Sequence, residues 1–207
     1  MERDRRALIV RVVAILVIAV LGWVLFIRAP GPGTVSQAAL DASRAAGCDD
    51  LERPVTPNPS RMHLAPGESY DYPDRPPAAG PHDPSPLPPD PHVHAEPVSE
   101  TRAVHNLEHA YVLIWYRPAA VGGLSGETIS ALEDLAGAQD RVIMAPYPDM
   151  PEGRALAFLA WNTRWLCPAG ISPDQALTIG RAFIQAYRGT TNAPEAPRGL
   201  LGRLFSP

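Results

Sequence analysis

The residues best suited to chemistry form the pentapeptide His105-Asn106-Leu107-Glu108-His109. On a helix His105, Glu108 and His109 share one face, because residues three and four positions apart are neighbours there. This is the H-x-x-E-H arrangement of the inverted zinc peptidases, in which two histidines hold Zn²⁺ and the glutamate activates a bound water. In an extended segment the two histidines would still share a face, whereas Glu108 would point away. The competing interpretation is two hydrogen-bonded structural histidines at a strand entrance, with Glu108 paired to an arginine such as Arg102.

Two further histidines extend this cluster. His82 follows Gly80-Pro81, a turn that would present its ring at a fixed point, and His63 lies upstream. Four-coordinate sites built from histidines and a carboxylate suit zinc or copper. The sequence therefore predicts a zinc or copper site with His82, His105 and His109 as core ligands, completed or supported by His63 or Glu108.

Three functional hypotheses follow from these residues. The leading one is a binding or accessory protein of the cell envelope that carries the metal site. The second is a zinc hydrolase, with His105 and His109 as ligands, Glu108 as the general base and Glu195 as a third ligand from far along the chain. The third is a structural domain without metal, whose histidines tie a proline-rich coil to a sheet and which recruits a protein partner.

An apolar run from Ala7 to Ile27, broken only by Arg11, precedes these residues. At about 1.5 Å per residue it reaches about 31 Å, the thickness of a hydrocarbon core. Because arginines crowd its N-terminal flank, the positive-inside rule places the N-terminus in the cytoplasm and the rest outside. We therefore expect a cytoplasmic stub and single transmembrane anchor over residues 1–30, with a cleaved signal peptide as the alternative.

Charge and cysteine content fit an exported domain. The net charge is −4 and all eighteen basic residues are arginines, without the basic stripe of a nucleic-acid binder. Cys48 and Cys167 are the only cysteines, and in an extracytoplasmic chain such a pair favours a disulfide over two buried free thiols.

The remaining chain divides by composition. Residues 31–47 read as a linker that can turn helical around Ser36–Ala46, and residues 48–195 as an extracytoplasmic domain. Within that domain fourteen of the forty-four residues in 54–97 are proline, which predicts an extended coil wrapped over a folded core. Residues 196–207 form a C-terminal tail.

Hydrophobic patterns predict the elements of the core. Strands are expected over 110–116, 141–145 and 154–161, a helix over 126–137, and a second helix from Ser172 to about Arg188. The order β-α-β-β-α indicates an α+β fold with helices on one face of a small sheet.

Several blocks together resemble a bacterial group, the domain-of-unknown-function family 3105. They are Tyr72-Pro73, Pro76-Pro77-Ala78-Ala79-Gly80-Pro81-His82, Val104 to His109, Ala145-Pro146-Tyr147, Leu159-Ala160-Trp161 and Ala193-Pro194-Glu195. The chain departs from the family at Ala78-Ala79, where Thr-Ser is usual, and at Ala110, where glycine is usual. The resemblance implies an exported, often membrane-anchored domain and supplies no reaction.

Overall fold

The computed structural model describes residues 11, 13–18 and 31–197. The chain divides into two units, residues 1–31 and residues 32–207. Within the first unit residues 13–18 are helical. Among the described residues no helix is both long and apolar enough to cross a membrane. Most of the expected anchor over residues 7–27 lies outside them, as do residues 198–207 of the expected tail.

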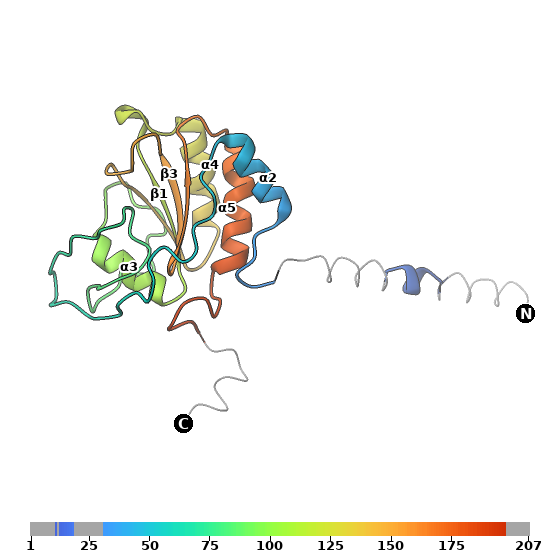
Figure 1. Ribbon diagram of the computed structural model, residues 1–207. Coiled ribbons are helices and arrows are strands. Elements are labelled where there is room, and N and C mark those ends of the chain that lie inside the picture. The colour runs from blue at the N-terminus through green and yellow to red at the C-terminus, as the bar shows by residue number, and fades with distance from the viewer. Residues whose placement is uncertain (1–10, 12, 19–30, 198–207) are drawn as a thin grey trace, which may run out of the picture. The chain divides into compact units, whose positions relative to one another are not determined.

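The second unit is built on a four-stranded sheet (Figure 1). Its strands are β1 (Val112–Tyr116), β2 (Val142–Pro146), β3 (Leu156–Ala160) and β4 (Thr163–Cys167), arranged in the order β2-β1-β3-β4. β1 pairs with β2 in parallel and with β3 antiparallel, and β3 pairs antiparallel with β4. Every strand residue is buried, so both faces of the sheet are covered.

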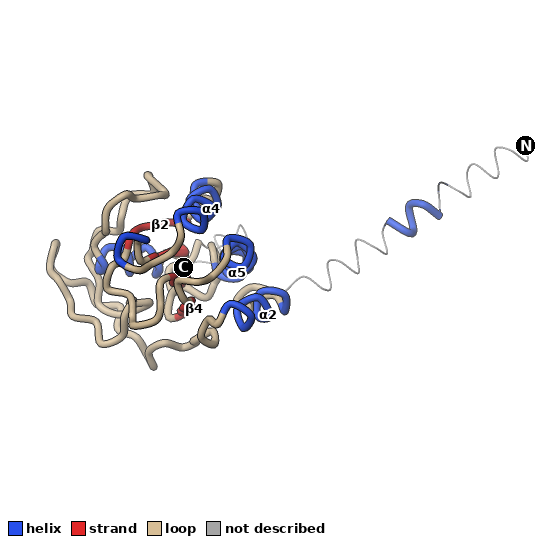
Figure 2. The backbone as a smooth tube through the Cα atoms, turned by 90° about the horizontal axis from the view of Figure 1, so that it is seen from above, coloured by secondary structure: helices blue, strands red, loops and turns tan. Residues whose placement is uncertain are grey.

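Three helices cover one face of the sheet (Figures 1 and 2). α4 (Gly126–Gly137) connects β1 to β2, as a parallel pair requires. α5 (Pro173–Tyr187) follows β4, and α2 (Gln37–Ala46) packs against α5. Residues 37–46 were expected within a linker; they instead form part of the folded unit, because the apolar face of α2 buries Ala39 in the common core.

The opposite face is covered by α3 (Glu100–Glu108) and the proline-rich coil. Val104 and Leu107 of α3 and Leu87 of the coil pack with Leu113 and Trp115 of β1. The α+β class is therefore confirmed. The expectation that helices lie on one face holds for α2, α4 and α5, whereas α3 packs with the coil against the opposite face.

Strand β4 was not expected from the sequence. Its second residue, Arg164, is buried, which breaks the apolar pattern of a core strand. The guanidinium is compensated by the carboxylate of Glu52 at 2.8 Å and by the carbonyls of Arg75 and Pro76. Buried charge is tolerated here because it is fully paired, and it fastens the coil to the sheet.

The predicted disulfide is confirmed. Cys48 follows α2 and Cys167 ends β4, and their sulfurs are bonded. The bridge spans 119 positions of sequence, and residues 54–97 lie within it. This coil carries only isolated bridges, such as His63 with His82 and Val93 with Met144.

Candidate metal centre

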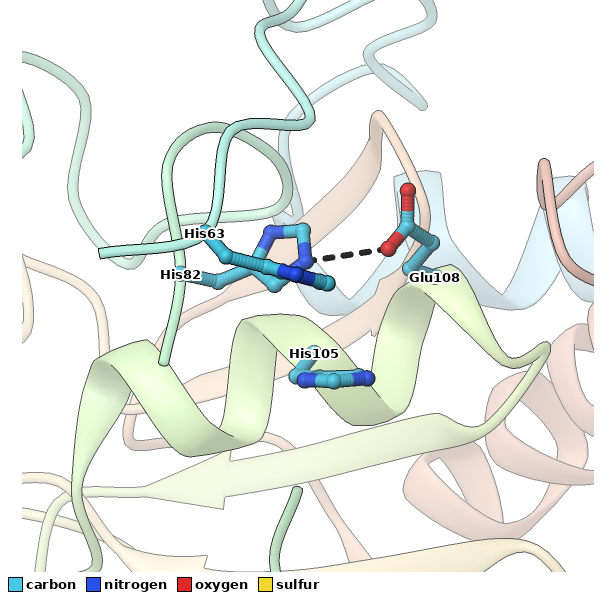
Figure 3. A group of neighbouring side chains, drawn as sticks. All are labelled: His63, His82, His105 and Glu108. Carbon is cyan, nitrogen blue, oxygen red and sulfur yellow. Dashed lines mark ion pairs between the residues drawn. The ribbon is translucent and has the colours of Figure 1, made fainter. Parts of the chain in front are cut away.

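Helix α3 supplies two of the candidate ligands. It begins at the N-cap Ser99, whose hydroxyl accepts a hydrogen bond from the amide of Arg102. It ends at Glu108, and Ala110 then adopts φ 63°, the left-handed conformation typical of a helix end. The helical alternative for the pentapeptide is therefore the one found, and His105 and Glu108 lie on the same face of α3 (Figure 3).

The proline-rich coil supplies the other two candidate ligands, His63 and His82. His63 and His82 face each other in an isolated parallel bridge, in which the amide of Leu64 donates to the carbonyl of His82. The turn before His82 requires a glycine, because Gly80 has φ 127° and a Cβ there would lie 3.2 Å from the ring of Tyr72. The hydroxyl of Tyr72 donates to the carbonyl of Pro81 at 2.6 Å and so fastens the turn.

These four side chains converge (Figure 3). One ligand atom from each of His63, His82, His105 and Glu108 lies within 4.8 Å of all the others. The ligand atoms of a tetrahedral zinc site with bonds of about 2.0–2.1 Å are separated by about 3.3 Å. His82, His105 and Glu108 are buried, whereas His63 is exposed and forms the edge of the group. The arrangement could hold one metal ion with little movement.

The tautomers of two histidines are fixed by backbone carbonyls. Nδ1 of His82 lies 2.8 Å from the carbonyl of Gly80, and Nδ1 of His105 lies 2.6 Å from the carbonyl of Asp83. A carbonyl only accepts, so each Nδ1 carries a proton, and Nε2 is the nitrogen that each ring has left to bind a metal ion. Ligating histidines are commonly oriented in this way.

The bare nitrogen of His82 faces a carboxylate. Its Nε2 lies 2.9 Å from Oε2 of Glu108, yet the contact lacks hydrogen-bond geometry, so this buried atom has no hydrogen-bond partner among the described residues. A neutral imidazole nitrogen and a carboxylate oxygen are both acceptors. Facing each other in a buried site, they require a cation between them, either a proton or a metal ion.

His109 lies outside this group. Its Nε2 is 2.9 Å from Nε2 of His105 and 3.7 Å from Oε2 of Glu195, so the distant carboxylate named as a third ligand does reach the second histidine. Burial lowers the pKa of His109, and the neighbouring His105 lowers it further. Of the five residues predicted to hold metal, four converge and His109 stands on the far side of His105.

The arginine beside Glu108 is Arg61, with its Nε 3.8 Å from Oε1. Arg102, the partner suggested by the sequence, donates instead to the carbonyls of Ser85 and Pro86. Sequence reasoning also assigned no role to Tyr72 or to the loop around Asp83. The carboxylate of Asp83 accepts hydrogen bonds from the amides of Gly67 and Ser85, which lower its pKa and hold the loop whose carbonyl orients His105.

Comparison with known proteins gives a family and no activity. No curated protein and no solved structure matches the chain. A family model described as protein of unknown function DUF3105 matches residues 63–199, a span that begins at the first converging histidine and contains the whole group. Because the match covers more than half of the sequence, the chain belongs to the DUF3105 family.

Proposed function

We propose that this chain is a membrane-anchored metal-binding protein of the cell envelope, which holds one divalent zinc or copper ion and acts as a binding or accessory protein. The ligands are His63, His82, His105 and Glu108. The observation that carries the proposal is the buried pair of acceptors, Nε2 of His82 and Oε2 of Glu108, at 2.9 Å. A divalent ion between them would satisfy both and draw in the other two rings.

The chemistry of the donor set supports a divalent ion. Three imidazoles and one carboxylate are borderline to hard ligands, which suit Zn²⁺ and Cu²⁺, whereas Cu⁺ favours thiolate and thioether sulfur. Both cysteines are consumed in the disulfide, so the chain offers no thiolate. With four protein ligands the site resembles a closed binding centre more than an open catalytic one.

The location in the envelope is supported by two features. The apolar run Ala7–Ile27 with its N-terminal arginines is typical of a signal anchor. The disulfide between Cys48 and Cys167 is expected of a chain that matures in an oxidising compartment. Both features support a position of the metal-binding domain outside the cytoplasm.

Elemental analysis of the purified full-length chain in detergent tests the proposal. We expect about one equivalent of zinc or copper per chain, bound as purified or after reconstitution with either ion. In His82→Ala the tightly bound ion should be lost, because the buried Glu108 then has no imidazole opposite it. His92→Ala is the matched control, since His92 lies in the same coil and contacts the carbonyl of Val142 and the carboxylate of Asp90 instead of the group.

A second variant guards against a folding defect in His82→Ala. Glu108→Gln keeps the shape of the side chain and removes its charge, and we expect metal affinity to fall at least about tenfold while circular dichroism stays unchanged. A folded chain that takes up neither ion would overturn the proposal. So would undiminished binding in both variants.

A zinc hydrolase is less well supported. In its favour, the pentapeptide is helical and Glu195 lies near His109. Against it, the proposed general base Glu108 is only 2% exposed and faces His82, whereas a general base must face the water that attacks the substrate. Glu108 is placed to bind metal, and the binding role fits the site better.

A further inference from the structure

The two sides of the metal group differ in charge. On the side of His63, the guanidinium of Arg61 lies 3.8 Å from Glu108 and presents a positive charge to any approaching cation. On the side of His109, the half-exposed carboxylate of Glu195 presents a negative charge. A cation is steered toward the second side. Arg141 carries a positive charge on this side as well; its guanidinium donates to the carbonyl of His109 and lies over the ring of Tyr111.

The side of His109 also opens to solvent. The ring lines a pocket of about 290 Å³ together with Leu87, Tyr111 and Arg141. The side chain of His109 is 36% exposed and that of Glu195 is 52% exposed, whereas the ligands His82, His105 and Glu108 are buried. An imidazole and a carboxylate with oxygen and nitrogen atoms 3.7 Å apart are therefore available to a hydrated ion before it reaches the buried group.

His105 connects the two positions. Its Nδ1 donates to the carbonyl of Asp83, which leaves a single in-plane lone pair on Nε2. That lone pair faces Nε2 of His109 at 2.9 Å, and His105 is also a member of the group formed with His63, His82 and Glu108. The two ring planes are nearly parallel, at 15°, and His105 has to tilt against its hydrogen bond to Asp83 to move its lone pair from one position to the other. One lone pair binds one ion, so the two positions exclude each other.

We propose that His109 and Glu195 form an outer metal position through which Zn²⁺ or Cu²⁺ reaches and leaves the buried site, with His105 as the ligand shared by both. The ion is first held by His109 and Glu195, acquires His105, and then passes to His82, Glu108 and His63 as His105 turns. The inference rests on the proposed function of the buried group. It adds a route and a second set of ligands.

Loading kinetics of the full-length chain test the route, with Co²⁺ as the probe because tetrahedral Co²⁺ is visible by its absorption bands. In His109→Ala and Glu195→Gln the loading rate constant should fall at least about tenfold, the scale of electrostatic steering. The rate of release to excess EDTA should fall by a similar factor. The dissociation constant should change by less than about fivefold, the worth of one neutral hydrogen bond.

Two control variants test whether the loading rate depends on charge at the side of His109 in particular. Arg61→Gln removes the positive charge on the side of His63 and should not slow loading. Glu152→Gln removes an exposed carboxylate from the loop between β2 and β3 and should leave every rate unchanged. A direct measure of the outer position comes from His82→Ala, in which weak residual Zn²⁺ binding should disappear when His109→Ala is added.

The outcomes distinguish this inference from the proposed function. Suppose that the unvaried chain binds metal, but His109→Ala and Glu195→Gln take up Co²⁺ as fast as the unvaried chain or faster. The outer position is then refuted and the buried site stands. If His109→Ala weakens equilibrium binding more than tenfold, His109 belongs to the buried site and the outer position is equally refuted. A chain that binds no metal refutes both.

Discussion

At the scale of single residues, the buried site depends on backbone carbonyls that orient imidazole rings. His82 and His105 each donate Nδ1–H to a carbonyl in the coil, at Gly80 and Asp83. No carboxylate fulfils this role for either ring among the described contacts. Ring orientation therefore depends on the shape of two short loops, and residues that hold those loops act on metal affinity without touching the ion.

Tyr72 is the residue in which this dependence is most readily tested. Its hydroxyl donates to the carbonyl of Pro81, and burial raises the pKa of Tyr72 well above its usual value, so the group stays protonated. Tyr72→Phe leaves a buried carbonyl without a partner and should lower the free energy of unfolding by about 1–2 kcal/mol. Zn²⁺ affinity should fall about three- to tenfold as the turn before His82 loosens.

Tyr70→Phe is the matched control, because Tyr70 is 37% exposed and its ring packs edge-on against Tyr72 without holding the turn. Urea unfolding and competitive Zn²⁺ titration of both variants provide the comparison. Equal effects of the two substitutions would contradict a specific role for the Tyr72 hydroxyl.

The site was only partly predictable from the sequence. His105 and Glu108 could be paired because helix periodicity fixes neighbours three residues apart. The place of His82 followed from its turn, but the convergence of His63 depends on how an irregular coil folds back, which no periodicity encodes. His109 was expected among the core ligands because i and i+4 neighbours share a face; the helix ends one residue earlier, and the ring of His109 lies beyond His105.

At the scale of elements, close packing of α5 on the sheet depends on Gly180. A Cβ at this position would lie 3.0 Å from atoms of both Leu135 on α4 and Phe158 on β3. Gly180→Ala should therefore lower the free energy of unfolding by about 1–2 kcal/mol, because overpacking outweighs the gain in helix propensity.

For Gly137→Ala, at the end of α4 in the same layer of helices, we expect the opposite effect on the free energy of unfolding. A Cβ there meets nothing within 4 Å, so the substitution should raise the free energy of unfolding by up to about 1 kcal/mol. Thermal or urea unfolding of the two variants checks both signs. Stabilisation by Gly180→Ala would show that α5 can move away from the sheet at little cost.

Most core elements were predictable because local patterns encode them. The run ending at Tyr116 and the serine–proline start of α5 fix their elements within a few residues. β4 was missed because Arg164 interrupts its apolar pattern, and only the tertiary partner Glu52 makes that burial acceptable. The docking of α2 was missed because its apolar face is short and its partner α5 lies far away in the sequence.

At the scale of the whole molecule, the disulfide encloses the candidate metal site. All four converging residues lie between Cys48 and Cys167 in the sequence. Closing a loop of this length removes unfolded-state entropy worth about 4–5 kcal/mol in the chain-entropy model. The bridge therefore limits how far the coil can separate from the sheet when the chain unfolds.

The double variant Cys48→Ala, Cys167→Ala tests this contribution. We expect the free energy of unfolding of the metal-free chain, measured in urea, to fall by about 2–5 kcal/mol. Metal stoichiometry should stay near that of the unvaried chain, because neither cysteine touches the ligand group. Unchanged stability would mean that the unfolded chain is already confined in other ways.

The sparse bonding of the coil has a consequence for the lifetime of the protein. Residues 54–97 have no ladder of their own and are attached at isolated points, one of which is the bridge between His63 and His82 beside the metal group. A bound ion would lock that point, whereas a metal-free chain would release it more often and expose extended backbone, the form that proteases cut. The supply of metal would then set how long each copy survives, and the amount of the protein would follow the availability of its ion.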